Sequence, residues 1–220
     1  MKEYVPVLKR TKLFSGVGDE NIAAMLSCLG ARLQHYKKGN YVLRQGEYLR
    51  DIVVLAEGCL HIQKDDFWGN RSILGKIGVG EIFGEAYVAP DSGPLLNDVV
   101  AVEDCAVFFF DVRRVITTCS SACAFHTTVV QNLFFAISGK NRSLVQKLDY
   151  ISRRTTREKL LSYLSEEAKR QKSAGSIILP FNRQQLADYL SVDRSAMSNE
   201  LCKMRDEGML EFDKNHFWLK

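Results

Sequence analysis

A short polar helix face near the end of the chain carries the side chains best suited to bonding with another molecule. A helix starting at Arg194 turns by about 100° per residue, which places its apolar residues on one side and its small polar residues on the other. The polar side carries the arginine, Ser195, Ser198, Asn199 and Cys202. Short donors and acceptors in the first turns of a helix are the groups that meet base edges in DNA. We therefore interpret this face as a base-reading surface.

Two helices joined by a tight turn must position this face, and the local sequence predicts both. Asn182 and Gln185 can form a capping box that begins the first helix. Asp193 is placed to cap the second helix, and Gly208 is suited to the left-handed conformation that ends it. The second helix also has a buried stripe at spacings of four and three: Met197, Leu201 and Met204.

The residues after Gly208 decide between a DNA-binding motif and an unpartnered helical hairpin. An isolated helix-turn-helix pattern is more often the latter. Here two apolar-rich runs follow, at 209–212 and 216–219, and the turn-forming residues 213–215 separate them. That pattern indicates a β-hairpin. Helix, turn, second helix and hairpin together predict a winged helix-turn-helix.

Length and composition fit a two-domain protein of the cytoplasm. The 220 residues suffice for two modest domains. The net charge is +4. Residues 150–220 hold 13 basic and 10 acidic side chains, and residues 1–149 hold 17 basic and 16 acidic ones. Most of the excess positive charge is therefore in the C-terminal part, where phosphate binding would need it. We find no signal peptide and no apolar run near about 18 residues, which predicts a soluble protein without a membrane partner. Six irregularly spaced cysteines indicate a reducing compartment.

The middle of the chain has a different pattern. From Ala31 to Asp111, short runs rich in Val, Ile, Leu, Tyr and Phe alternate with turn signals, among them glycines at positions 39, 46, 58, 69, 80 and 84. Turns about every ten residues predict a small all-β barrel or double-sheet roll rather than alternating β/α units.

A long helix is expected from Arg113 to about Leu148. Apolar residues recur along it at intervals of seven: Val130, Ile137, Leu144 and Ile151. A second apolar series lies between them, at Leu133 or Phe134 and at Leu148, and residues 139–141 interrupt it. This heptad pattern favours a dimer seam, and a helix packed within the chain's own core is the alternative. Ser152 is expected to cap a further helix from 153 to about 171.

A glycine-punctuated β-roll, a long helix and a winged helix-turn-helix, in that order, resemble the cyclic-AMP receptor and fumarate-nitrate reductase regulator (Crp/Fnr) family of bacterial transcription factors. The most specific matches are YKKGNYVLRQGE, GEIFGE at 80–85, and NRQQLADYL followed by VDRSAMS. The resemblance implies an α+β fold with a jelly-roll (double-stranded β-helix, cupin-like) effector domain at 1–118, a dimerisation helix at 119–149 and a DNA-binding domain at 150–220. It also implies a homodimer on a palindromic operator in double-stranded DNA, with RNA polymerase as a further partner.

The sequence departs from the family's cyclic-AMP binders at the effector site. Those proteins carry a Gly-Glu pair followed by an Arg-Ser pair that binds the cyclic phosphate. Gly84 and Glu85 match the first pair, but Leu95 and Leu96 stand at the second. Two leucines cannot neutralise a buried phosphate, so we expect a less polar small-molecule effector than cyclic AMP, or none. Glu85 has a second interpretation as a carboxylate that caps a turn. On the central helix, the region of the family's partner-helix effector contacts matches Arg142 and Ser143.

The resemblance also suggests the DNA contacts. The family's base-reading arginine matches Arg194, whose partner would be guanine, while Ser195 and Asn199 replace a glutamate and a second arginine. The operator should therefore differ from that of the cyclic-AMP receptor. The family's phosphate contacts at the start of the first helix match Asn182, Arg183 and Gln184.

Other chemistries find little support. The family's iron-sulfur branch has clustered N-terminal cysteines, whereas this chain has none before Cys28. Cys119 and Cys123 supply half of a tetrahedral metal site, so we interpret them as buried thiols, with a redox pair as the alternative. No phosphate loop, HExxH, GxSxG or paired-carboxylate motif indicates an enzyme. The other interpretations are a redox-responsive or ligand-independent regulator of the same fold, and a cyclic-nucleotide sensor that binds no DNA, which the wing disfavours.

Overall fold

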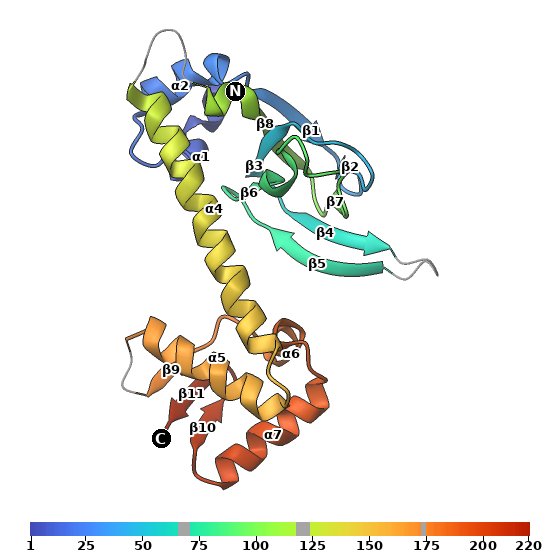
Figure 1. Cartoon of the computed structure of the whole chain (residues 1–220), viewed down its shortest axis with the longest axis vertical. Helices are drawn as coiled ribbons and strands as arrows, with labels where there is room; N and C mark the ends of the chain where they lie inside the picture. The colour runs from blue at the N-terminus through green and yellow to red at the C-terminus, as the bar shows by residue number, and fades with distance from the viewer. Residues whose placement is uncertain (66–70, 118–123, 173–174) are drawn as a thin grey trace. The chain divides into compact units, whose positions relative to one another are not determined.

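The chain divides into two compact units, Met1–Ser138 and Gly139–Lys220. The structure is a computed structural model and describes residues 1–65, 71–117, 124–172 and 175–220. The first unit contains two β-sheets and several helices, and the second contains a three-stranded sheet and further helices, as Figure 1 shows. The long helix α4 (Ala124–Ile151) contributes residues to both units.

The strands of the first unit form a jelly roll, as the sequence predicted. One four-stranded sheet has the order β1-β8-β3-β6 and the other has the order β2-β7-β4-β5. Neighbouring strands are antiparallel throughout. The strands are β1 (Arg32–Tyr36), β2 (Tyr41–Leu43), β3 (Asp51–Glu57), β4 (Leu60–Asp65), β5 (Arg71–Ile77), β6 (Ile82–Phe83), β7 (Asp98–Ala101) and β8 (Cys105–Asp111).

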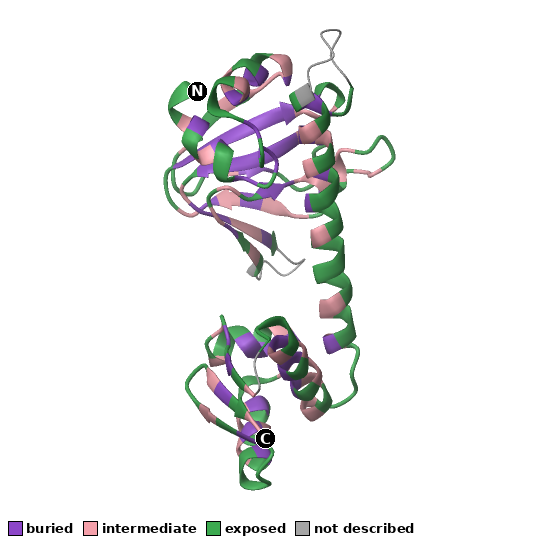
Figure 2. Cartoon of the chain, turned by 90° about the vertical axis from the view of Figure 1, so that its left-hand side faces the viewer, coloured by how far each residue is buried: buried purple, intermediate pink, exposed green. Residues whose placement is uncertain are grey.

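Strands β3 and β8 are apolar except at their ends, because both of their faces are buried. Val53 and Val107 face the core between the two sheets. Their neighbours Val54 and Phe108 face a second core, which the helices cover. A strand that is covered on both sides has a continuous apolar run, here IVVLA and CAVFFF, instead of an alternating pattern. Figure 2 shows these strands as the buried centre of the unit.

Helices cover the outer face of the sheet β1-β8-β3-β6. The first half of α4 contributes Val129, Leu133 and Ala136 to the second core. The prediction of one helix from Arg113 to Leu148 is wrong at its start, because α3 ends at Ile116 and Thr117 has an extended backbone. Cys119 and Cys123 lie outside the described residues. The other helices here are η1 (Lys2–Tyr4), α1 (Val5–Arg10), α2 (Asp19–Cys28), η2 (Glu85–Tyr87) and α3 (Val112–Ile116).

The second unit contains the predicted winged helix-turn-helix. Helices α6 (Arg183–Leu190) and α7 (Arg194–Asp206) are followed by the hairpin of β10 (Leu210–Asp213) and β11 (His216–Leu219). A third strand, β9 (Ser176–Ile178), completes an antiparallel sheet in the order β10-β11-β9.

The helix that precedes this motif starts later than predicted. Helix α5 is Thr156–Arg170, and Thr155 caps it in a capping box with Glu158. Ser152 does not cap a helix, since its hydroxyl donates to the Asp149 carbonyl at 3.0 Å. The expected cap at Ser152 is therefore wrong by three residues, and the turn between α4 and α5 lies at residues 152–155 instead of 149–152.

An aromatic cluster joins the end of α4 to the core of the second unit. The ring of Tyr150 meets that of Tyr163 edge-on at 5.5 Å, and the Tyr163 ring lies 5.5 Å from that of Tyr189. Burial raises the pKa of Tyr150 to about 12, so this phenol stays neutral at physiological pH. The last turn of α4 is thus fixed to α5 and α6. Within the described ranges, no helix has the length and apolar character needed to cross a bilayer.

Candidate DNA-binding and effector sites

The start of α7 presents polar side chains to solvent. Asp193 caps the helix, because its carboxylate accepts a hydrogen bond from the Ala196 amide at 2.7 Å. Arg194, Ser195 and Asn199 are exposed. Ser198 is half-buried and donates its hydroxyl to the Arg194 carbonyl at 2.9 Å, so its donor is used inside the helix. Three free polar side chains therefore remain at the tip of α7 for contact with another molecule, and the opposite side is fully buried at Met197, Leu201 and Met204.

The start of α6 carries the three predicted phosphate contacts, each with a partner within the chain. Asn182 forms the predicted capping box, because its side-chain oxygen accepts from the Gln185 amide and the Gln185 side chain accepts from the Asn182 amide, both at 2.9 Å. Gln184 donates to the Asp188 carboxylate at 2.8 Å. The free backbone amides of this first turn still point outward along the helix axis, where a phosphate is favoured.

Arg183 lies against the wing instead of projecting into solvent. Its guanidinium carbon is 4.7 Å from the ring centre of Phe212 and 4.8 Å from that of Phe217. Burial lowers the pKa of Arg183, although a guanidinium remains charged at physiological pH. This cation–π contact ties the start of α6 to β10 and β11. The side chain thus positions the wing, a role that its place in the sequence did not indicate.

Arg157 of α5 clamps α7 from behind. Its guanidinium donates to the Glu200 carboxylate at 3.3 Å and to the Glu207 carboxylate in a bidentate pair. Glu200 lies in the middle of α7 and Glu207 at its C-terminal cap, two helical turns later on the same side, so one arginine holds the second half of the helix. The pairing also offsets part of the negative charge that the two carboxylates place on this side of α7. Sequence analysis missed this clamp because its members are 43 and 50 residues apart.

Helix α6 is held at its other end by a lysine. The Lys159 ammonium donates to the carbonyls of Leu190 and Ser191, at 3.2 Å in both cases. These are the carbonyls that the helix leaves without partners at its C-terminus, where a positive charge is favoured. Ser191 has a φ of 52°, the left-handed conformation that makes the sharp turn into α7. Helix α5 thus fixes both helices of the motif.

An apolar stripe on α4 is exposed to solvent. The exposed fractions are 66% for Phe134, 41% for Ile137, 61% for Leu144 and 60% for Leu148. Leu133, the alternative to Phe134 in the predicted seam, is instead buried in the first unit's core. The stripe therefore runs at spacings of three and four through Phe134, with the polar Asn141 in the middle. A large exposed apolar stripe with this spacing is typical of a coiled-coil seam that lacks its partner.

The effector-site candidates of the first unit occupy a turn and a core position. Gly84 has a φ of 81°, and a β-carbon there would collide with Leu49, so the tight turn into η2 requires glycine. Glu85 is the first residue of η2. Leu95 is 4% exposed and belongs to the core between the sheets, whereas Leu96 is 62% exposed. Leu95, which the sequence predicted to stand at the position of the phosphate-binding arginine, is therefore an apolar core side chain.

Backbone hydrogen bonds fix Leu95 beside the turn at residues 46–47. The backbone of Leu95 is held by two hydrogen bonds of 2.8 Å, to the Gly46 amide and the Glu47 carbonyl, which fix its side chain in the core. Among the residues that the structure describes, no lysine or arginine is buried. Arg142 and Ser143 lie on the second half of α4 and are exposed, and the Ser143 hydroxyl donates to the Gly139 carbonyl at 3.1 Å.

Comparisons with known protein families match the same two parts of the chain. The family of the cyclic nucleotide-binding domain matches residues 33–121, and the family of the Crp-like helix-turn-helix domain matches residues 158–220. The cyclic AMP receptor protein of Thermus thermophilus is 25% identical over 206 residues, which cover 92% of this chain and 89% of that protein.

Solved structures share the fold. CprK in complex with OCPA superimposes with a TM-score of 0.66 at 15% identity, over 91% of each chain. The catabolite activator protein of Thermus thermophilus has a TM-score of 0.54 at 21% identity, over 96% of this chain and 94% of that one.

Proposed function

The chain belongs to the Crp/Fnr-type DNA-binding transcription regulators with an effector-binding domain, and we propose that it acts as a homodimer that reads a palindromic operator. The observation that carries the proposal is the exposed apolar stripe of α4, beside a helix-turn-helix whose polar tip is free. A parallel pair of α4 helices would cover the stripe. It would also present two copies of α7 about one turn of DNA, ~34 Å, apart.

In this proposal, α7 supplies the base contacts. Arg194 is the side chain long enough to reach guanine with two hydrogen bonds, and Asn199 suits adenine. Ser195 adds a donor that pairs with several bases. Ser198 is a supporting contact, because its hydroxyl keeps an acceptor while it donates to the helix.

The phosphate contacts come from the start of α6. The amides of its first turn and the side chains of Asn182 and Gln184 would hold the DNA backbone. Arg183 would act mainly by fixing the wing, since its guanidinium lies over two rings. Phosphate contacts of this kind set the register of the protein on DNA and make affinity fall with salt.

The effector in this proposal is a small molecule other than cyclic AMP. Leu95 is buried in apolar surroundings, and a cyclic phosphate placed there would lose its water without gaining a positive charge. Glu85, Leu96 and, from the partner, Arg142 and Ser143 would surround a ligand of lower polarity. The chain would act in the cytoplasm as a regulator and not as an enzyme, with RNA polymerase as a further partner.

Selection of bound duplexes from a random DNA pool tests the proposal. The chain should enrich inverted repeats, and an Arg194→Ala variant should lose preference at one base pair in each half while keeping the other positions. Lys214→Ala, at the tip of the wing, is the matched control for loss of one positive charge in the same unit. Recovery of unrelated sequences by both the unaltered chain and Arg194→Ala would refute the base-reading role of α7.

A further inference from the structure

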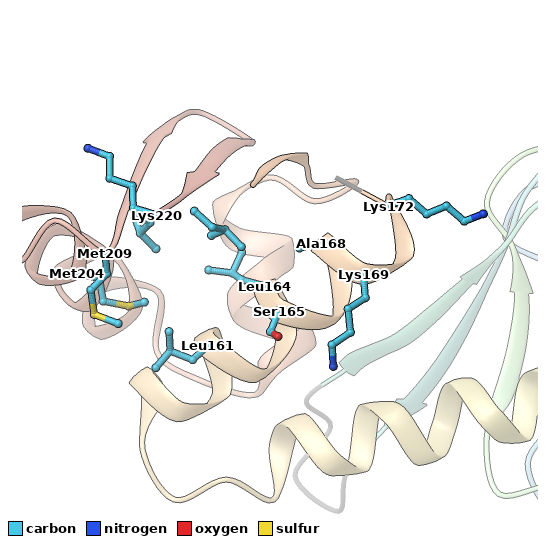
Figure 3. A pocket seen from close by; sticks show the side chains of 11 residues that line it. Leu161, Leu164, Ser165, Ala168, Lys169, Lys172, Met204, Met209 and Lys220 are labelled. Carbon is cyan, nitrogen blue, oxygen red and sulfur yellow. The ribbon is translucent and has the colours of Figure 1, made fainter. Parts of the chain in front are cut away.

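A pocket of about 440 Å³ lies in the C-terminal unit, away from the polar tip of α7. Figure 3 shows its side chains, which come from α5, from the last turns of α7 and from the two strands of the wing. A volume of this size is typical of a site for a small organic molecule. Neither the base contacts nor the effector-site candidates above are among its lining residues.

The floor and one wall of this pocket are apolar. Leu164, Met204 and Leu210 form the floor, and they are buried members of the unit's core. Leu161 and Met209 form the wall and are 37% and 36% exposed. Leu161 is on the outer side of α5, where solvent normally favours a polar residue. Methionine side chains adapt to ligands of different shape, which suits a site for a flexible chain.

Two lysines supply positive charge at the edge of this apolar surface. Lys169, Lys172 and Lys220 line the pocket. The Lys220 ammonium pairs with the Glu211 carboxylate at 2.5 Å, which leaves Lys169 and Lys172 as the basic groups of the rim. Figure 3 shows the three lysine side chains around Leu164, with their ammonium groups extended outward, away from it. Lys169 approaches Glu166 only at 3.5 Å, with 73% of its side chain exposed, so its ammonium can turn toward a ligand. An apolar floor with a basic rim is complementary to an anion that carries an apolar chain.

We propose that this pocket binds a small amphiphilic carboxylate. The apolar chain would lie on Leu161, Leu164 and Met204, and the carboxylate would pair with Lys169 or Lys172 at the edge. Burial of the chain would supply most of the affinity, since an exposed ion pair contributes little. This site is separate from the β-roll, and its ligand need not be the effector of the proposed function.

Calorimetric titration of the full chain with decanoate, below the concentration at which it forms micelles, tests the site. We expect saturable binding of one decanoate per chain. Leu161→Glu should weaken it by about tenfold or more, because the variant removes the apolar wall and adds a repelling charge. Ile178→Glu is the matched control, since Ile178 is an exposed apolar residue of the same unit outside the pocket. It should leave the affinity unchanged.

A second pair of measurements distinguishes specific binding at this site from nonspecific hydrophobic binding. Decyltrimethylammonium has the same apolar chain with a positive head and should bind at least about tenfold more weakly than decanoate. If Leu161→Glu does not fold, the double variant Lys169→Gln, Lys172→Gln should reduce this preference for the anion.

The proposal fails if decanoate shows no saturable binding, if the Leu161 and Ile178 variants bind it equally, or if the cation binds as well as the anion. Operator binding without decanoate should be unchanged in Leu161→Glu. Failure of the pocket would therefore leave the regulator function standing.

Discussion

Truncation of Leu144 tests the dimer seam with a magnitude that the structure supplies. Leu144 is 61% exposed in the single chain. Complete burial of a leucine stabilises by about 1.5–3 kcal/mol, so covering the exposed part contributes about 1–2 kcal/mol per chain. A two-fold dimer contains the contact twice, which gives about 2–4 kcal/mol for the pair. Alanine retains part of this area, so Leu144→Ala should raise the dimer dissociation constant by about 10- to 100-fold.

Sedimentation equilibrium over a range of concentrations measures this constant. Ile73→Ala is the matched control, because Ile73 is also 61% exposed but lies on strand β5 of the β-roll. It should leave the constant unchanged, and both variants should keep the unfolding midpoint of the first unit. If the two variants dissociate at the same concentration as the unaltered chain, the stripe of α4 is not the seam.

Three further predictions follow from the sites. Arg194→Ala should weaken operator binding by about 1–3 kcal/mol in gel-shift titrations and relax specificity at one base, whereas equal affinity for all duplexes would contradict its role. Leu95→Arg should lower the midpoint of urea unfolding, because it buries a charge without a partner, and it should not create tight cyclic-AMP binding in calorimetry. Arg157 holds the pKa of Glu207 below the ordinary value of 4.5, so their pairing stabilises above that pH and is lost as pH falls through the lowered value. Glu207→Gln should therefore show a weaker loss of stability in acid than the unaltered chain, and parallel acid curves would contradict the clamp.

Local signals in the sequence predicted the DNA-binding motif well. The capping box at Asn182, the cap at Asp193 and the left-handed Gly208 each depend on residues only a few positions apart. Such short-range hydrogen bonds form wherever the helix forms, so they can be read without the rest of the fold. The same holds for the turns of the β-roll, where Gly84 needs its positive φ.

Features that depend on a choice between two neighbouring candidate residues, or on contacts between residues far apart in the sequence, were not predicted. Thr155 and Glu158 also form a capping box, but Ser152 precedes them and offered an earlier start. Leu133 and Phe134 are both apolar and adjacent, and only the packing of the β-roll decides that Leu133 is buried. Arg183 was expected to face phosphate, yet the wing that follows it about 30 residues later supplies aromatic rings for it. These outcomes need the tertiary fold.

The mass of the complex with DNA tests the central proposal most directly. Native mass spectrometry of the chain with a duplex selected from the random pool should show two chains per duplex. A duplex in which one half-site is scrambled should lose both chains together at the same protein concentration, because each chain depends on its partner. A single chain bound to the intact duplex, or one chain retained on the scrambled one, would contradict a dimer that presents two recognition helices in fixed relation.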